Sequence, residues 1–535
     1  MLPSLLLATL SGLLYVFAFA PWDQTYLAWP AFVPLLLAVE LLPAGKRITK
    51  NLVLLGLIVG IIVSIGGFYW VIHATQEYGG LPLFAAVLLF VIFCFINQLQ
   101  IPLWLILREG FLKRNLLARF PIFRAFSFAV FYAGIESIYP KLFSDTVGNA
   151  FSHAPWIRQV AALGGPFLLT VMLIATAELW FVAVRHKKWV PGIIGLALPV
   201  FALSYGSYHT AEYRKLEVAH AGDPSFKLAM IQANIGDYLK VAAEHGSFAA
   251  VLEVVGKYLD LSNQALKDPA TPDAIVWPET AYPAVFQHPM SSVDMKMEGK
   301  MQEFFQTLKG HMIFGGYDAD PSGVEYNSIF FYNSQEQKKQ VYHKNVLLMF
   351  GETLPFADVF PSIKGWFPNM GFFGRGPGPE VYDVMNRTGD HFKLAPSICY
   401  EGLFPAISAK DAELGADALL NVTNDSWFGP NGEPDLHLAL TNFRSVETGL
   451  PMLRATNTGY TVWIDPLGNF VKSTELGQTG ILQAEIRKRF TPEPLYLAVS
   501  RVLGGDWFIR ITWILTAIGI AFVAYKPKSL KTPKA

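Results

Sequence analysis

The chain has 535 residues, of which 52% are hydrophobic and 16% are charged, and its mean hydropathy is +0.33. A soluble globular protein carries about 25% charged residues, so this composition indicates a membrane protein. The formal net charge is zero, so no overall basic field favours nucleic acid as a partner. The two cysteines, Cys94 and Cys399, are too few for a disulfide framework.

Apolar runs recur along the first 207 residues, and one more follows near the C-terminus. Each is close to or above the roughly 20 residues that a helix needs to cross a bilayer. The first run has no basic segment before it and more spans follow it, so we interpret it as a span rather than a signal peptide. The predicted spans are residues 3–20, 27–43, 52–72, 82–107, 121–139, 159–183, 189–206 and 507–525.

The loops between these spans alternate in charge. One set of loops and the C-terminal tail together hold fifteen Lys and Arg residues, whereas the other set holds only Lys141 and Arg158. Because Lys and Arg stay on the cytoplasmic side of a membrane, we expect both termini in the cytoplasm and residues 208–506 on the opposite face. The charge pattern disfavours the alternative that some runs are buried helices of a soluble core.

Residues 208–506 have a different composition, in which short apolar strands alternate with amphipathic helices. This alternation is typical of an α/β domain with buried sheets. The predicted strands are 226–235, 272–280, 311–318, 328–333, 392–401 and 417–425, and the predicted helices are 248–266 and 300–310. The predicted domains are a seven-helix transmembrane domain (1–207), an extracytoplasmic catalytic domain (208–506), an eighth transmembrane helix (507–525) and a basic cytoplasmic tail (526–535).

Several predicted strands end in polar or reactive side chains: Glu279 in VWPETA, Cys399 in SICYEG, and Asn424 with Asp425. Lys344, in VYHKN, lies between two predicted strands. Ligands of α/β folds gather at strand ends. A thiol nucleophile needs a base to take its proton and a cation to stabilise developing charge, and these residue types supply both. Each residue taken singly also has an ordinary interpretation, as a solvated rim carboxylate, a surface lysine or a core thiol.

Other kinds of site have weaker support. No G-x-S-x-G elbow favours a Ser-His-Asp triad. The histidines lack H-E-x-x-H spacing and residues 208–506 hold no second cysteine, so we expect no metal, and no cofactor is predicted. The Gly-rich segment 371–380 lacks the strand–loop–helix context of a phosphate-binding motif and is interpreted as a surface loop.

The motifs WPET, YHK with FGE, and SICYEG, in this order, resemble those of the nitrilase (carbon–nitrogen hydrolase) superfamily. The wider pattern is similar to a membrane-bound family within it, the apolipoprotein N-acyltransferases, nearly throughout residues 421–469 and again at 20–36. The resemblance implies a nitrilase-like αββα sandwich, inserted as an α/β domain on a bundle of eight transmembrane helices. It also implies a bacterial inner membrane location with the catalytic domain on the periplasmic side.

The resemblance implies roles for individual residues. Glu279 becomes the general base, Lys344 the oxyanion stabiliser and Cys399 the nucleophile. Met349 and Val241 depart from the family's pattern, which leaves the lipid contacts open. The supporting residues are Glu352, Tyr400 and Glu401, and the substrate-binding residues are Asn327 and Trp427, for which packing or loop anchoring is the alternative.

The implied activity is acyl transfer from the sn-1 position of a phospholipid, through a cysteine thioester, to the N-terminal amine of diacylglyceryl-cysteine. The implied partners are a phospholipid donor, a diacylated apolipoprotein acceptor and the lipid bilayer, and we expect a monomer. Residues 358–375, rich in Phe and Trp, are expected at the substrate entrance. The alternatives are a membrane-tethered amidase or nitrilase that hydrolyses a small amide, and a non-catalytic lipid- or lipoprotein-binding module with a decayed site.

Overall fold

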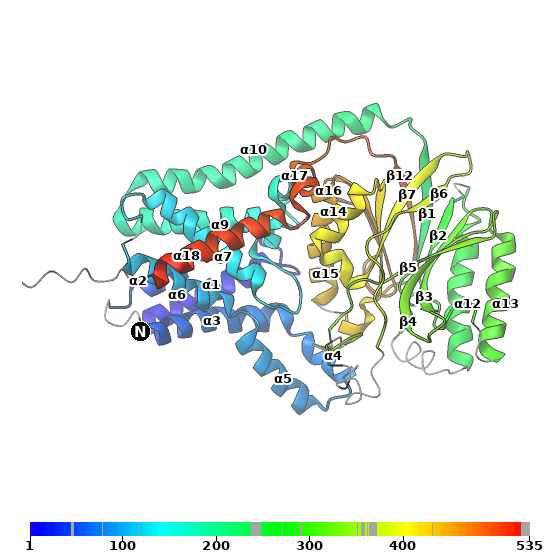
Figure 1. Ribbon diagram of the computed structural model, residues 1–535, viewed down its shortest axis with the longest axis horizontal. Coiled ribbons are helices and arrows are strands. Elements are labelled where there is room, and N and C mark those ends of the chain that lie inside the picture. The colour runs from blue at the N-terminus through cyan, green and yellow to red at the C-terminus, as the bar shows by residue number, and fades with distance from the viewer. Residues whose placement is uncertain are drawn as a thin grey trace, which may run out of the picture. The chain divides into compact units, whose positions relative to one another are not determined.

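The computed structural model divides the chain into two compact units, drawn in Figure 1. One consists of Met1–Ile72, Pro82–Ser207 and Asp506–Ala535, and the other of His73–Leu81 and Tyr208–Gly505. The structure describes residues 1–43, 48–77, 79–115, 117–236, 248–269, 271–288, 292–349, 351–354, 359–360, 362, 372–430 and 432–525, without the side chains of Phe248 and Trp427. Val241, the basic tail and most of the predicted entrance segment 358–375 therefore lie outside the described residues.

The first unit is helical, and a helix lies at each of the eight predicted spans. Its main helices are α1 (Leu2–Ala18), α2 (Val33–Glu40), α3 (Thr49–Phe68), α5 (Leu83–Ile96), α6 (Gln100–Lys113), α7 (Pro121–Ile138), α9 (Ala161–His186), α10 (Trp189–Ala219) and α18 (Trp507–Ala524). The shorter helices are η1 (Thr25–Ala28), α4 (Val71–Glu77), η3 (Val147–Phe151) and α8 (Pro155–Arg158). Among the described residues, five segments are long and apolar enough to cross a membrane: Thr49–Phe68, Leu83–Lys113, Ala161–His186, Trp189–Ala219 and Trp507–Ala524.

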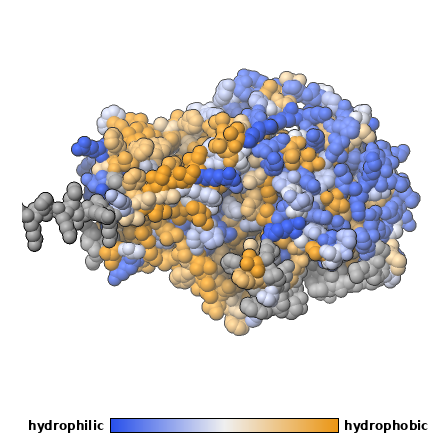
Figure 2. Space-filling model, in the orientation of Figure 1, coloured by the Kyte–Doolittle hydropathy of each residue, from blue (hydrophilic) through white to orange (hydrophobic). Residues whose placement is uncertain are grey.

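The surface of the helical unit is apolar over broad areas, as Figure 2 shows. Phe84, Leu88, Trp189 and Ile514 each leave more than half of their surface exposed. Exposed apolar surface on this scale is rare on soluble monomers and marks contact with lipid or another protein. The helices are therefore suited to a bilayer.

Two helical segments of this unit differ in extent from the predicted spans. The predicted span 82–107 is divided into α5 and α6, because Pro102 has no N–H to donate to the carbonyl of Gln98 and its ring crowds that carbonyl. The predicted end at residue 206 falls inside α10, which continues to Ala219. The sequence HTAEYRKLEVA is rich in strong helix formers, so the helix continues after the apolar run has ended.

The second unit contains two six-stranded sheets. The first has the order β12-β1-β2-β3-β4-β5 and the second the order β11-β10-β9-β8-β7-β6. The strands of the first are β1 (Ser225–Gln232), β2 (Ala274–Val276), β3 (His311–Ala319), β4 (Glu325–Asn333), β5 (Lys338–His343) and β12 (Gly480–Arg487). Those of the second are β6 (Tyr382–Met385), β7 (His391–Ile398), β8 (Ala418–Thr423), β9 (Met452–Thr456), β10 (Val462–Ile464) and β11 (Phe470–Ser473).

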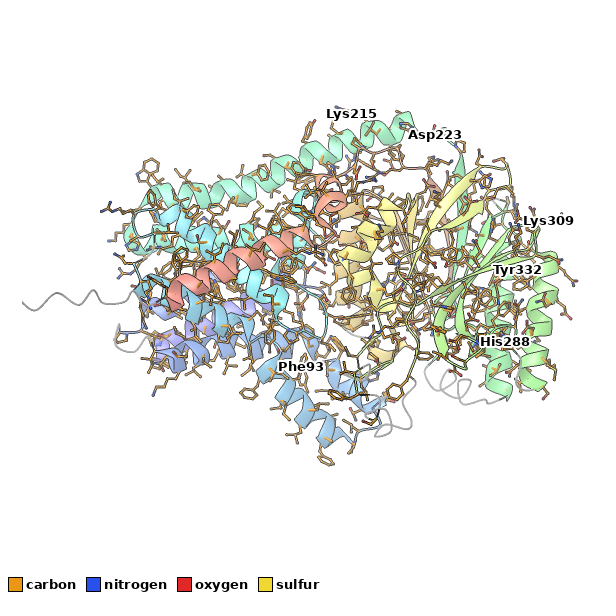
Figure 3. All side chains as sticks on the ribbon, in the orientation of Figure 1. Phe93, Lys215, Asp223, His288, Lys309 and Tyr332 are labelled. Atoms are coloured by element: carbon orange, nitrogen blue, oxygen red, sulfur yellow. The ribbon has the colours of Figure 1, made fainter. Side chains whose placement is uncertain are left out.

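The two sheets pack face to face, and helices cover their outer faces. One buried cluster joins Leu228 and Ile329 of the first sheet to Leu420 and Leu453 of the second. A second cluster packs α12 (Phe248–Ala265) and α13 (Ser292–Thr307) on the first sheet, where the ring of Tyr332, labelled in Figure 3, stacks on Phe305 with centroids 4.1 Å apart. A third cluster packs α14 (Pro405–Glu413), α15 (Glu433–Thr441) and α17 (Leu495–Leu503) on the second sheet. The layers are therefore αββα.

Each of the six predicted strands overlaps an observed strand, and both predicted helices overlap α12 and α13. The strands β1, β2 and β3 run parallel, as do β7, β8 and β9, while the other neighbouring pairs are antiparallel. Because parallel strands end at the same edge of a sheet, residues that follow β7 and β8 lie close together. Glu279, after β2 of the other sheet, joins them through a hydrogen bond from the Asn424 N–H. The described part of the Gly-rich segment, residues 372–380, holds neither helix nor strand, as expected for a loop.

Candidate active site

The structure brings the three predicted catalytic side chains into one buried site. Glu279 follows β2, Lys344 follows β5, and Cys399 follows β7 at the start of the short helix η5 (Cys399–Leu403). All three are less than 10% exposed. The charges of Glu279 and Lys344 both act on the Cys399 thiol, so the carboxylate, the ammonium and the thiol share one low-dielectric environment.

Lys344 is held between two carboxylates. Its Nζ lies 2.8 Å from Oε1 of Glu352 and 3.4 Å from Oε1 of Glu279. Nδ2 of Asn327 donates to the same two oxygens, at 2.9 Å and 2.8 Å. The backbone N–H of Asn424, after β8, donates to the other oxygen of Glu279 at 3.0 Å. Hydrogen bonds to both oxygens therefore fix the orientation of the Glu279 carboxylate.

The electrostatics of the site determine the protonation states of Lys344 and Cys399. Burial disfavours the ammonium of Lys344, but Glu352 and Glu279 outweigh this effect and raise its pKa above the ordinary value, so it stays charged. Burial and the charge of Glu279 raise the pKa of the Cys399 thiol, and Lys344 only partly opposes them. The resting nucleophile is therefore a thiol that needs a base to become reactive.

The backbone at Cys399 is strained, with φ of 51°, in the left-handed region that a side chain rarely adopts. Such a residue costs roughly 1–3 kcal/mol and persists only where its neighbours hold it. Glu401 holds one side, because its Oε2 accepts from the Ile398 N–H at 2.7 Å and the Tyr342 hydroxyl at 3.0 Å. Its Oε1 accepts from the N–H of Val346, which connects the nucleophile's turn to the segment that carries Lys344.

The remaining predicted residues have different surroundings. Tyr400 is half-buried, and its ring packs edge-on against Phe404 with centroids 5.1 Å apart. Asn327 is buried and contacts the two carboxylates, which favours a role in holding them. Met349 is exposed. The side chain of Trp427 lies outside the described residues, so its predicted role stays a prediction.

The sequence placed Asp425 at the end of a strand, but sequence reasoning missed the cluster of buried polar residues around it. Asp425 follows β8, Arg454 lies on β9, and Glu433 and His437 lie on α15. Arg454 pairs with Asp425 at 3.0 Å, and His437 lies 3.1 Å from Asp425 and 3.4 Å from Glu433. The two carboxylates and the imidazole could hold a metal ion by their spacing, but the guanidinium already supplies a cation there. The available signal was a charged Arg inside the apolar strand sequence MLRAT.

Comparisons with known proteins agree with this fold. Residues 227–491 match the family model of carbon-nitrogen hydrolases, and residues 11–179 match that of the apolipoprotein N-acyltransferase N-terminal domain. Apolipoprotein N-acyltransferase of Bdellovibrio bacteriovorus is 32% identical over 489 residues, which cover 88% of this chain and 85% of that protein. The enzymes of the same name from Geobacter metallireducens and Pseudomonas putida are each 28% identical and cover 90% and 94% of this chain and 89% and 96% of their own lengths.

The αββα unit with its buried cysteine, lysine and glutamate defines a carbon–nitrogen hydrolase type of protein. Within this class, the chain belongs to the apolipoprotein N-acyltransferase family and is an acyltransferase. The long apolar helices and the relatives make it a bacterial membrane protein.

Proposed function

We propose that this enzyme moves an acyl chain from the sn-1 position of a phospholipid to Cys399, and then to the N-terminal amine of diacylglyceryl-cysteine in an apolipoprotein. The observation that carries the proposal is the buried Lys344 ammonium held between Glu352 and Glu279, beside a strained cysteine. The apolar helices supply a reason for a lipid donor, since a phospholipid can approach within the bilayer.

In the first half-reaction the Cys399 sulfur attacks the carbonyl carbon of the ester while Glu279 takes the thiol proton. The raised pKa of the Cys399 thiol explains why this base is needed. Lys344 donates a hydrogen bond to the oxyanion that forms. When the carbon–oxygen bond of the ester breaks, Glu279 returns the proton to the departing lysophospholipid, and a thioester remains on Cys399.

In the second half-reaction the neutral amine of the lipoprotein attacks the thioester carbon. A carbon–nitrogen bond forms, the carbon–sulfur bond breaks, and Glu279 carries the surplus proton from the amine to the cysteine sulfur. The site is reset without any co-reactant. A buried, water-poor environment favours this outcome, because water is the competing acceptor of the acyl group.

The other predicted residues support this chemistry. Glu352 and Asn327 fix Lys344 and Glu279, and Glu401 fixes the turn at Cys399. Tyr400 lies next to the nucleophile and Trp427 on the segment after β8, where we assign them to the substrate side of the site.

We also propose that eight helices span the inner membrane, with residues 208–506 in the periplasm and both termini in the cytoplasm. The distribution of fifteen Lys and Arg against two over alternating loops supports this orientation. Labelling of single introduced cysteines with an impermeant reagent in spheroplasts tests it. Cysteines near the exposed Asp260 should react from outside, and cysteines in the tail should not.

A transfer assay tests the proposed function. The enzyme is incubated with phospholipid labelled in its sn-1 chain and a synthetic diacylated lipopeptide with a free N-terminus. The proposal predicts label in the amide-linked position of the peptide, and none with the Cys399→Ala variant. Label released only as free fatty acid, or release of ammonia from a small amide, would favour the membrane-tethered amidase.

A further inference from the structure

Arg454, on β9, is fully buried, and its guanidinium contacts three side chains, those of Asn421, Asp425 and His437. Nη1 donates to Oδ1 of Asn421 at 2.7 Å, and Nη2 donates to Oδ2 of Asp425 at 3.0 Å. A buried charge is tolerated only where it is paired and hydrogen-bonded. These contacts therefore fix the orientations of the Asn421 and Asp425 side chains.

Asn421 connects Arg454 to the nucleophile. Its Nδ2 donates to the backbone carbonyl of Cys399 at 3.2 Å and to Oγ of Ser397 at 3.1 Å. Because Oδ1 of the amide accepts from Arg454, the amide keeps its NH₂ group directed at Cys399. This contact holds the strained residue on its carbonyl side, whereas Glu401 holds the preceding N–H.

Asp425 connects Arg454 to the sulfur. The Thr423 hydroxyl donates to Oδ1 of Asp425 at 3.3 Å, and the same hydroxyl acts to lower the pKa of the Cys399 thiol. The carboxylate contributes to the raised pKa of that thiol. Burial opposes ionisation of Asp425, but Arg454 and His437 together outweigh burial and lower the pKa of Asp425 to about 2. Without the guanidinium, the thiolate would form beside a carboxylate that lacks its main counter-charge.

We propose that Arg454 is a positioning residue for the nucleophile: it orients Asn421 toward the Cys399 carbonyl and neutralises the buried Asp425 carboxylate, which accepts from the Thr423 hydroxyl. The inference rests on the proposed role of Cys399 and deepens it. The same contacts predict a specific electrostatic effect, which a purely structural arginine would not have.

Other charged side chains also act on the Cys399 thiol and on Asp425. Glu279 and Lys344 act on the thiol from the first sheet, and His437 and Glu433 face Asp425 from α15. Burial and Asp425 raise the pKa of Glu433 to about 7, so this glutamate titrates near neutral pH. The test therefore compares all variants at one fixed pH, so that the protonation states of these neighbouring side chains are matched as closely as possible.

The test is the rate at which iodoacetamide alkylates Cys399 at pH 8 in the full-length, detergent-solubilised protein carrying Cys94→Ala. At a pH well below the pKa of a thiol, the alkylation rate falls about tenfold for each unit by which that pKa rises. A charge at a few ångströms shifts a pKa by about 1–3 units. Arg454→Gln should therefore slow alkylation about tenfold or more, and Arg454→Lys, which keeps the charge, should slow it less. The double variant Arg454→Gln/Asp425→Asn should return towards the wild-type rate.

Asp425→Asn, which conserves volume, keeps the proposal testable if Arg454→Gln does not fold. It leaves Arg454 as an unmatched cation and should speed alkylation. Arg108→Gln is the matched control, because Arg108 is also buried and pairs with Glu178 on α9 of the helical unit; it should lower stability and leave the alkylation rate unchanged. Wild-type alkylation rates in folded Arg454→Gln or in Asp425→Asn would overturn the proposal. Alkylation needs no turnover, so failure of the acyl-transfer proposal would appear separately, as a missing acyl adduct.

Discussion

Lys344 and Glu352 form the shorter of the two ion pairs at the candidate active site, with 2.8 Å between Nζ and Oε1. The side chain of Lys344 is 2% exposed and that of Glu352 is 12% exposed, so water screens this pair little. The contact draws the ammonium away from a closer pairing with Glu279, which lies 3.4 Å away. Glu279 thereby remains available as a base while the lysine stays charged.

The first prediction concerns this pair. Glu352→Gln removes one of the two anions beside Lys344, so the ammonium should move onto Glu279 and weaken it as a base. We expect acyl-enzyme formation to slow by about 10- to 100-fold, somewhat less than the ~10²–10³ typical of losing an oxyanion donor outright. The measurement is single-turnover acylation with labelled phospholipid. Glu325→Gln, an exposed change on the same strand as Asn327, is the control and should acylate at the normal rate.

The second prediction separates the role of Glu279 as a base from its effect on the reactivity of the Cys399 thiol. Glu279 raises the pKa of the Cys399 thiol, so Glu279→Gln should lower that pKa. Iodoacetamide should then alkylate Cys399 faster at pH 8, even though acylation by phospholipid is lost. Slower alkylation in this variant would show that the carboxylate does not act on the thiol as described.

The third prediction concerns Glu401, whose oxygens accept from Ile398, Tyr342 and Val346. In Glu401→Gln one acceptor becomes an NH₂ group facing a donor, and an unsatisfied buried group costs about 1–3 kcal/mol. We expect a lower melting temperature together with reduced activity, measured on the same preparation. Glu413→Gln changes a glutamate on α14 paired with Lys410 and should leave both quantities nearly unchanged. A normal melting temperature in Glu401→Gln would contradict its role as an anchor.

The fourth prediction follows from the lowered pKa of Asp425, about 2 in the folded protein against about 3.9 in an unfolded chain. A group whose pKa is depressed by folding stabilises the protein above its unfolded pKa and loses that effect as pH falls. The full contribution is on the order of 2–3 kcal/mol. Between pH 5 and pH 3 the wild type should therefore lose more thermal stability than Asp425→Asn. An equal loss in both proteins would rule out this linkage, and Asp260→Asn, an exposed change, should behave as the wild type.

Part of the fold could be predicted from the sequence because its signals are local. Apolar runs predicted where helices lie, and apolar segments ending in Glu279 and Cys399 predicted the strands that carry the site. The strands β5, β6 and β9 to β12 were not predicted. β9 is only five residues long and carries Arg454 within it, and β11 is short and mostly exposed, so neither has the apolar signature of a buried strand.

The rest of the site could not be predicted because it depends on contacts between distant segments. Asn421 and Arg454 are 33 residues apart, and they meet because β8 and β9 are parallel neighbours with these two residues in register. Nothing in the spacing indicates that Asn327 holds Glu279, or that Cys399 has a positive φ. These features come from the packing of two sheets, which the motifs alone do not encode.

The central claim is that Cys399 carries the acyl group during transfer. Its most direct test is peptide mass spectrometry of the enzyme after exposure to phospholipid, with no lipopeptide present. The account predicts the mass of one acyl chain on the peptide that contains Cys399, removed by hydroxylamine and by later addition of diacylated lipopeptide, and absent from Cys399→Ala. Acyl transfer to the lipopeptide by a Cys399→Ala enzyme, or an adduct found on a different residue, would contradict it.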